Sequence, residues 1–202
     1  MSAFKNFPWR SFKKRSRVAK LMEIEKTPLE GLLITRSPIH RDARGFLTEL
    51  CQFDKLKKAI GYDPGFTRII LSDSERKGVL RGLHAEPWNK LIYFTHGSVL
   101  SAIADIRPES PTFGKVRTGV IDDKYPYGLY IPQGFANGFC ALTDKVRLIY
   151  FVSGYYKPSQ KKRSIIWNDP DLNILWPLSD PILSEEDQKN LTLREVYPAK
   201  FP

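Results

Sequence analysis

The sequence of 202 residues is poor in the residue types that build disulfide frameworks and transition-metal sites. Its only cysteines, Cys51 and Cys140, are too few for a disulfide framework and lie in apolar surroundings, so we expect reduced, buried thiols in a cytoplasmic protein. The three histidines, His40, His84 and His96, are far apart, and no second histidine lies two to four residues from His84. Because transition-metal sites usually use several imidazole ligands, the sequence predicts no metal.

Long apolar runs and nucleotide-binding loops are also missing. No apolar segment approaches the roughly 18–20 residues that span a bilayer. The basic N-terminus has no apolar region behind it, so we expect no signal peptide. There is no glycine-rich phosphate loop, no nucleophile elbow and no cysteine pair at zinc spacing. The chain length predicts one domain, with room for a sizeable core and an appendage.

Positive charge is concentrated at the start of the chain. Residues 1–21 carry seven basic residues and no acidic one, and so account for seven of the ten net positive charges. We predict that 1–21 is a mobile basic extension and that 22–202 is the folded domain. Four aromatic residues lie among these cations, which leaves three interpretations: a tail with no role of its own, contact with an anionic membrane surface, or a true start codon at Met22. Nucleic-acid binding would rest on the tail charge alone, and we expect no nucleic-acid partner.

From residue 28 onward, short apolar or alternating segments are separated by Gly, Pro, Asp and Ser. Such a pattern is typical of an all-β protein with an antiparallel sandwich or barrel, rather than of βαβ units. Two helices are predicted, at 53–60 and near 184–191, where Ser184 is a suitable N-cap. The predicted strands are 30–36, 45–52, 67–72, 90–95, 98–106, 115–121, 128–132, 138–142 and 146–154.

The segment GVLRGLHAEPWNK (78–90) brings His84 close in sequence to two cations, Arg81 and Lys90. Strand alternation would place Arg81 on one face and Gly82 and His84 on the other, and Gly82 would leave room for a ligand to approach. Histidine supplies a general base near neutral pH, and Lys90 could meet a developing negative charge. The alternative is a hydrogen-bonded core histidine beside a solvated lysine.

Tyr150 lies in the apolar segment VRLIYFV (146–152). An aromatic residue there is a core residue or, if its hydroxyl faces a cavity, a proton donor. Four further aromatic residues could stack on a nucleotide base or simply pack: Tyr155, Tyr156, Trp167 and Trp176.

Several segments, taken together and in order, resemble the dTDP-4-dehydrorhamnose 3,5-epimerase family. They are RDARGFLTEL (41–50), KGVLRGLH (77–84), DIRPESPTFG (105–114), IPQGFANGF (131–139), YYKPS (155–159), IIWNDPDLNILWP (165–177) and LSEED (183–187). The resemblance implies a jelly-roll (cupin-like) fold with short C-terminal helices and no metal or organic cofactor. It also implies a homodimer, in which the N-terminal strands of one subunit contribute to the site of its neighbour. The implied substrate is a nucleotide-diphospho-4-keto-6-deoxy sugar, epimerised in the synthesis of deoxysugars for polysaccharides.

The family's residue roles can be carried over onto matching positions. By resemblance, His84 is the base that removes a proton beside the C4 ketone, Lys90 stabilises the enolate, Tyr150 reprotonates from the opposite face and Asp187 orients His84. The substrate contacts implied by the same motifs are Arg44, Glu49, Arg81, Asn137, Tyr155 and Tyr156.

Three departures from the family pattern bear on the substrate. The family usually has histidine where this chain has Asn137, and its Gln-x-Asn pair before RGLH is replaced by a stretch that, apart from Arg68, is apolar (69–71). The loop from His84 to Lys90 is also shorter. These departures leave open a single-carbon epimerase, a 4-keto sugar ketoisomerase and a sugar-nucleotide-binding protein without activity.

Overall fold

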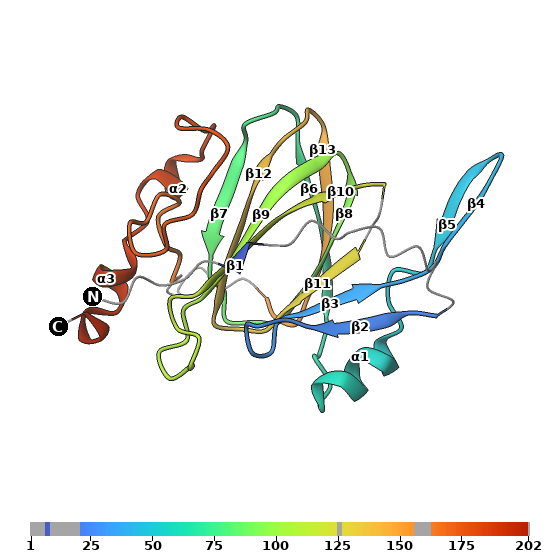
Figure 1. The fold of residues 1–202 in the computed structure, drawn as a ribbon, viewed down its shortest axis with the longest axis horizontal. Helices are drawn as coiled ribbons and strands as arrows, with labels where there is room; N and C mark the ends of the chain where they lie inside the picture. Colours follow the sequence, from blue (N-terminus) through green and yellow to red (C-terminus); the bar gives the residue numbers. More distant parts are fainter. Residues whose placement is uncertain (1–6, 9–20, 125–126, 156–162, 202) are drawn as a thin grey trace.

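The computed structural model describes residues 7–8, 21–124, 127–155 and 163–201. Two antiparallel sheets face each other across the core, with one short parallel pair at an edge (Figure 1). The six-stranded sheet has the order β2 (Glu23–Lys26), β3 (Leu33–Arg36), β11 (Tyr127–Ile131), β8 (Lys90–His96), β13 (Val146–Val152) and β6 (Arg68–Ser74). The five-stranded sheet has the order β1 (Phe7–Pro8), β10 (Val116–Asp122), β9 (Ser98–Asp105), β12 (Phe135–Ala141) and β7 (Leu80–His84).

Each sheet is covered on both faces, which explains why most of its strands are so apolar. The central core lies between the sheets and includes Ile92, Phe94, Phe135 and Phe139, all almost fully buried. On β9, alternation sends Ile103 inward. The neighbouring small residues of the same strand pack outward against the C-terminal segment. The result is the jelly-roll (cupin-like) sandwich that the family resemblance implies.

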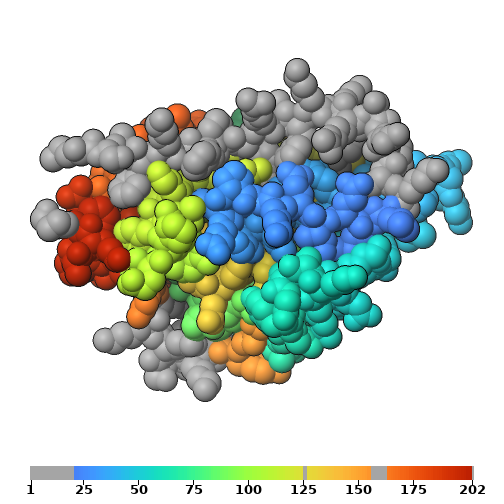
Figure 2. All heavy atoms as spheres, turned by 60° about the horizontal axis from the view of Figure 1, so that its bottom comes forward, coloured from blue at the N-terminus to red at the C-terminus, as the bar shows by residue number. Residues whose placement is uncertain are grey.

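The predicted helix at 53–60 is confirmed as α1 (Phe53–Ile60). Its Leu56 is buried against the outer face of the six-stranded sheet, beside Leu91 and Tyr130. The helix ends at Gly61, whose φ of 83° is the left-handed conformation that glycine adopts readily. Figure 2 shows α1 next to β2 and β3, with the C-terminal segment at the far end of the molecule.

The C-terminal segment contains α2 (Glu185–Gln188), α3 (Leu193–Val196) and the 3₁₀ helix η1 (Pro198–Lys200). Ser184 caps α2, as the sequence predicts, by accepting a hydrogen bond from the Asp187 amide. The helix is shorter than the predicted 184–191. The segment packs on the five-stranded sheet through Ile165, Leu172 and Leu193, which the chain order alone does not indicate.

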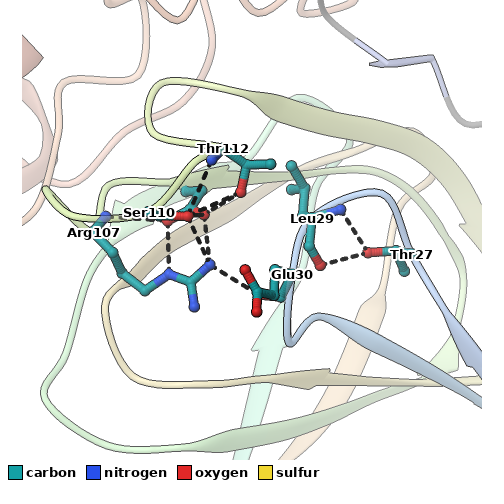
Figure 3. A network of polar contacts seen from close by, with 7 residues as sticks. Thr27, Leu29, Glu30, Arg107, Ser110 and Thr112 are labelled. Carbon is teal, nitrogen blue, oxygen red and sulfur yellow. Dashed lines mark hydrogen bonds and ion pairs between the residues drawn. The ribbon is translucent and has the colours of Figure 1, made fainter.

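A buried carboxylate organises the loop that follows β9. The Asp105 side chain accepts hydrogen bonds from Arg107 Nε at 2.8 Å, Ser110 Oγ at 2.6 Å and Thr112 Oγ1 at 2.5 Å. Arg107 also donates to the Glu30 carbonyl, which ties the loop to the turn before β3 (Figure 3). Burial alone raises the pKa of Asp105, but these donors outweigh it and hold the pKa below its ordinary value.

The interior strands are predicted well, and the exposed ones are not. The list of predicted strands lacks β1, β2, β4 (Ile39–Asp42) and β7. β7 lies in the 78–90 segment, for which the sequence did indicate strand alternation, whereas β2 and β4 carry charged, largely exposed residues and therefore lack the apolar signal of a strand. β4 pairs with β5 (Gly45–Thr48) in a hairpin that projects from the sandwich, and the predicted strand 45–52 ends early, at Thr48 (Figure 1). In the described part of the chain, no helix has both the length and the apolar character needed to cross a bilayer.

Part of the predicted N-terminal extension lies within the described residues. Phe7 and Pro8 form β1, which pairs in parallel with Arg117 and Thr118 of β10. The rest of the extension, residues 1–6 and 9–20, lies outside them, so the interpretations of the basic tail stay predictions.

Candidate active site

The site lies where the two sheets meet at their edge strands, β6 and β7. Arg81 of β7 connects these edges by donating to the Ser74 side chain at 3.1 Å and to the Asp73 carbonyl at 3.0 Å. From that contact, β7 continues to His84 and β6 runs back to Ile70. Both strands therefore lead from the turn at 75–79 toward the same end of the sandwich.

His84 is held by a buried carboxylate from the C-terminal segment. Its Nε2 lies 2.6 Å from Asp187 Oδ1, and the Asp187 side chain is only 5% exposed. Asp187 Oδ2 accepts the Gly82 amide at 3.3 Å, which fixes the carboxylate against β7. Burial alone raises the pKa of Asp187, but its hydrogen bond to His84, the charge of His84 and the contacts with Gly82 and Ser184 lower it below the ordinary value.

This contact determines which imidazole nitrogen can act. A carboxylate at Nε2 accepts a hydrogen bond from an N–H on that nitrogen, which keeps the proton there and leaves the lone pair on Nδ1. Within the described residues, Nδ1 has no hydrogen-bond partner, and the His84 side chain is 37% exposed. His84 and Asp187, which lie 103 positions apart in sequence, therefore have the arrangement that a general base and its orienting group would need.

Lys90 reaches across from the six-stranded sheet to the same place. Its residue is 4% exposed, and its Nζ donates to Asn137 Oδ1 at 2.6 Å and to the His84 carbonyl at 3.3 Å. Glu86 forms an ion pair with the same Nζ. Asn137 is also the cross-strand neighbour of His84 in the β12–β7 ladder. The ammonium group is thus held close to the base by three acceptors, in a setting where a fixed charge acts strongly on a nearby oxyanion.

Tyr150 faces the interior from the opposite sheet to His84. It lies between Ile70 of β6 and Ile92 of β8 in the six-stranded sheet and packs against the central core. Burial raises its pKa well above the ordinary value, and the charge of Glu86 raises it further, while Arg81 lowers it. The hydroxyl therefore stays protonated at neutral pH, as a proton donor requires.

Gly82 has a different role from the one its sequence position suggests. Its φ is +124°, and a Cβ built there would lie 2.6 Å from the Gly138 Cα and 2.8 Å from the Asn137 carbonyl oxygen. The group that approaches Gly82 is therefore the backbone of β12, not a ligand. The β12–β7 register shifts between Asn137 and Phe139, so the strict alternation expected across Arg81, Gly82 and His84 is not kept.

Other predicted site residues are not gathered around His84 within the single chain. Arg44 lies on the projecting β4–β5 hairpin, 90% exposed and paired with Asp42 at 2.5 Å (Figure 1). Glu49 follows this hairpin, is also exposed and accepts from Gln52 at 2.6 Å. Tyr155 is 61% exposed and lies against Arg68. Tyr156 lies outside the described residues.

The two C-terminal tryptophans line a different part of the surface. Trp167 and Trp176 border a shallow depression of about 260 Å³ that is formed entirely by residues 167–179. Trp176 donates from Nε1 to the Trp167 carbonyl at 2.7 Å and packs against the outer core. The contacts of Trp176 are those of a packing residue, which is the second of the two interpretations that the sequence leaves open.

Sequence reasoning overlooked two charged residues near the site. Glu86 lies four residues before Lys90, and that i,i+4 spacing of opposite charges was the available signal. Arg68 was visible only as the one charge in an apolar stretch, and it faces the same side of the sheet as Tyr150.

The two cysteines differ in how deeply they are buried. Both cysteines are free thiols, but only Cys140 is fully buried, whereas Cys51 is half-buried. Burial raises the pKa of Cys51 to about 11, so it is a poor nucleophile at neutral pH. Among the described residues, no three His, Cys, Asp or Glu side chains are grouped as metal ligands.

The fold and the site together are those of a cupin-like jelly-roll enzyme with a candidate acid–base site at the edge of the sandwich. The family model for dTDP-4-dehydrorhamnose 3,5-epimerase matches residues 26–195, and the chain belongs to this family. The dTDP-4-dehydrorhamnose 3,5-epimerase of Shigella flexneri is 38% identical over 170 residues, covering 82% of this chain and 93% of the relative.

Two solved structures extend the comparison. One is NovW, a 4-keto-6-deoxy sugar epimerase from Streptomyces spheroides, with a TM-score of 0.81 and 32% identity over 89% of this chain and 91% of the other. The second is the dTDP-6-deoxy-D-glucose-3,5-epimerase of Legionella pneumophila in complex with dTDP-4-keto-L-rhamnose. It has a TM-score of 0.79 and 33% identity, covering 86% of this chain and 93% of the other.

Proposed function

We propose that this protein inverts C3, C5 or both in a nucleotide-diphospho-4-keto-6-deoxy sugar, by proton removal and return through an enolate. The observation that carries the proposal is the His84–Asp187 pair, 2.6 Å apart, beside the buried Lys90. Family membership and relatives named for 4-keto-6-deoxy sugars support the substrate class. The reaction would be a cytoplasmic step in deoxysugar and polysaccharide synthesis.

The chemistry follows from which sheet supplies each group. Protons on C3 and C5 are acidified by the neighbouring C4 ketone, because their loss gives an enolate. His84 Nδ1 takes the proton, and the electron pair moves into the carbonyl, whose developing negative charge Lys90 Nζ stabilises. Such a stabiliser is typically worth about 3–4 kcal/mol. Tyr150 then returns a proton to the same carbon. Because His84 and Tyr150 belong to opposite sheets, they can approach opposite faces of the sugar ring, as inversion requires.

The direct test is proton exchange with solvent. The protein is incubated with dTDP-4-keto-6-deoxyglucose in heavy water, and deuterium at C3 and C5 is followed by NMR. We expect incorporation that His84→Asn abolishes and Tyr150→Phe reduces. Incorporation at one carbon identifies a single-carbon epimerase, and a shifted carbonyl identifies a ketoisomerase. If GDP- and CDP-linked 4-keto sugars also show no exchange, the protein has no epimerase activity.

The structure offers a matched control for this experiment. His96 also faces a carboxylate, Asp123, but at 3.6 Å and with its side chain 61% exposed. His96→Asn should leave exchange at the wild-type rate. An equal loss in both histidine variants would contradict the assignment of the base to His84.

The proposal includes a homodimer, as family membership suggests. Within one chain, Arg44 lies on the β4–β5 hairpin, and Glu49 directly follows it; the hairpin projects away from the sandwich, and its Leu47 is 74% exposed (Figure 1). The hairpin would supply these two residues to the site of the partner subunit.

Subunit mixing tests this arrangement. Arg44→Gln and His84→Asn should each be nearly inactive. Mixed in equal amounts and allowed to exchange subunits, they should recover about a quarter of the wild-type activity, because half of the dimers would contain one intact site. If each site uses its own hairpin, mixing restores nothing.

A further inference from the structure

Arg68 is a charged residue on the inner face of the site that the family's roles do not cover. In the six-stranded sheet, Val152 pairs with Arg68 on one side and with Lys90 on the other, so all three share one face. Two residue pairs further along, and so on the same face, Ile70 is the cross-strand neighbour of Tyr150. Two strand spacings separate the backbones of Arg68 and Lys90 by about 10 Å.

The guanidinium of Arg68 is held in place by backbone and aromatic contacts. Its Nε donates to the Gly154 carbonyl at 2.7 Å. Its Cζ lies 5.4 Å from the centre of the Trp88 ring and 5.6 Å from that of Tyr155. Trp88 is itself 8% exposed and packs closely on Gly154, where an added Cβ would lie 2.9 Å from the indole. These contacts orient the side chain without neutralising its charge.

Among the described residues, nothing forms a hydrogen bond or ion pair with the two Nη groups at the other end of this guanidinium. Arg107, Arg147 and Arg194 each pair with an aspartate at 2.6–2.7 Å. Arg68, by contrast, forms no ion pair with any described residue, and its two Nη groups donate to none of them. A planar fork that is fixed at Nε and free at both Nη atoms suits an anion with two neighbouring oxygens.

We propose that Arg68 binds the diphosphate of the nucleotide sugar and holds the sugar ring over Tyr150 and Lys90. The inference rests on the proposed function, which supplies the diphosphate. Two neighbouring phosphate oxygens would accept hydrogen bonds from both Nη groups. Their negative charge would also offset the positive charge of Arg68, which is the second cation on this face beside Lys90. Arg68 is then a substrate-binding residue of this chain, in the stretch where the family pattern usually has an uncharged Gln-x-Asn pair.

Binding of dTDP, compared with thymidine, tests the assignment by calorimetry on the full chain. Arg68→Gln should weaken dTDP binding about 10- to 100-fold and change thymidine binding less than about 3-fold, since only the phosphates are lost as partners. Arg68→Lys keeps the charge but not the fork, and should fall between wild type and Arg68→Gln. In the exchange assay, Arg68→Gln should raise KM more than it lowers kcat.

Arg194→Gln is the matched control. Arg194 also lies over an aromatic ring, that of Phe201 at 4.8 Å, but it pairs with Asp171 in the C-terminal segment. This variant should bind dTDP as wild type does. Equal weakening of dTDP and thymidine by Arg68→Gln would show a packing role through Trp88 and overturn the inference, as would no weakening of either.

The outcomes separate this inference from the proposed function. If dTDP binds through Arg68 but no nucleotide sugar exchanges deuterium, the epimerase proposal fails and the diphosphate site stands. If exchange occurs and Arg68→Gln binds dTDP normally, only the diphosphate site fails. Absence of binding by dTDP, GDP and CDP alike overturns the assignment of Arg68.

Discussion

Replacing Asp187 by Asn tests the central arrangement of the site without removing the base. The asparagine has the same shape, and its Oδ1 can still accept the Gly82 amide. It loses the negative charge and presents an amide donor to the imidazole. With a donor facing Nε2, His84 would carry its proton on Nδ1, the nitrogen that must accept the substrate proton.

The size of the effect follows from the contact. A hydrogen bond to a charged group is worth about 1.5–3 kcal/mol, or roughly a 10- to 150-fold change in rate at 1.4 kcal/mol per factor of ten. The wrong tautomer adds to this loss, up to the 10²- to 10⁴-fold that general-base catalysis typically contributes. We therefore expect Asp187→Asn to slow deuterium incorporation by about 10²- to 10⁴-fold, mainly in kcat.

Single-turnover exchange in heavy water, followed by NMR, measures this loss, and thermal unfolding shows whether the variant is folded. Asp171→Asn is the matched control, because Asp171 pairs with Arg194 at 2.7 Å in the same segment but outside the site. It should exchange at the wild-type rate. Wild-type exchange in folded Asp187→Asn would refute the reasoning that this carboxylate sets the tautomer of His84.

Two further predictions concern stability. Gly82→Ala should destabilise the protein by about 2–4 kcal/mol, because the new Cβ would lie 2.6 Å from the β12 backbone and the residue would keep a positive φ. Gly61→Ala is the control, since nothing lies within 4 Å of its added Cβ, and it should cost about 1 kcal/mol in the same denaturant titration. Asp105→Asn should cost about 3 kcal/mol at pH 7, because it leaves Arg107 without its charged partner. The folded-state pKa of Asp105 lies below its ordinary value of 3.8, so its contribution is present above that pH and is lost as the pH falls through the folded pKa. Unfolding measured at decreasing pH should therefore show wild type and Asp105→Asn converging in acid, and a constant difference would contradict the role of the charge.

The sequence predicts those strands and helices whose local residue pattern reflects how they are buried in the fold. The strand Lys90–His96 is apolar because both of its faces are covered, and α1 is bounded by a suitable glycine, so both could be predicted. The hairpin strand β4 and the edge strand β2 could not, because their exposed, charged residues resemble a loop. The position of Asp187 beside His84 depends on how the C-terminal segment packs, and only the family resemblance indicated it.

The residues that depart from the family pattern lie beside Lys90 and beside Tyr150. The residues that match the family's base, its orienting carboxylate and its proton donor, His84, Asp187 and Tyr150, are all kept. Asn137, which replaces the usual histidine, is the acceptor for Lys90 at 2.6 Å, and Glu86 in the shortened loop pairs with the same lysine. Ile70 and Arg68, which lie in the stretch that corresponds to the family's Gln-x-Asn pair, lie next to Tyr150 and in line with Lys90.

This distribution separates reaction from recognition. The residues that match the family's proton-transfer roles, and Lys90, are unchanged, whereas the residues next to them (Asn137, Ile70, Arg68 and the loop after His84) differ from the family pattern. Ile70 cannot accept or donate a hydrogen bond, so a sugar hydroxyl facing it would lose about 1 kcal/mol or more relative to one facing an amide. A sugar that presents a carbon–hydrogen face to Ile70 and its diphosphate to Arg68 fits this pocket better. The chemistry of the family is thus combined here with a binding surface of different polarity.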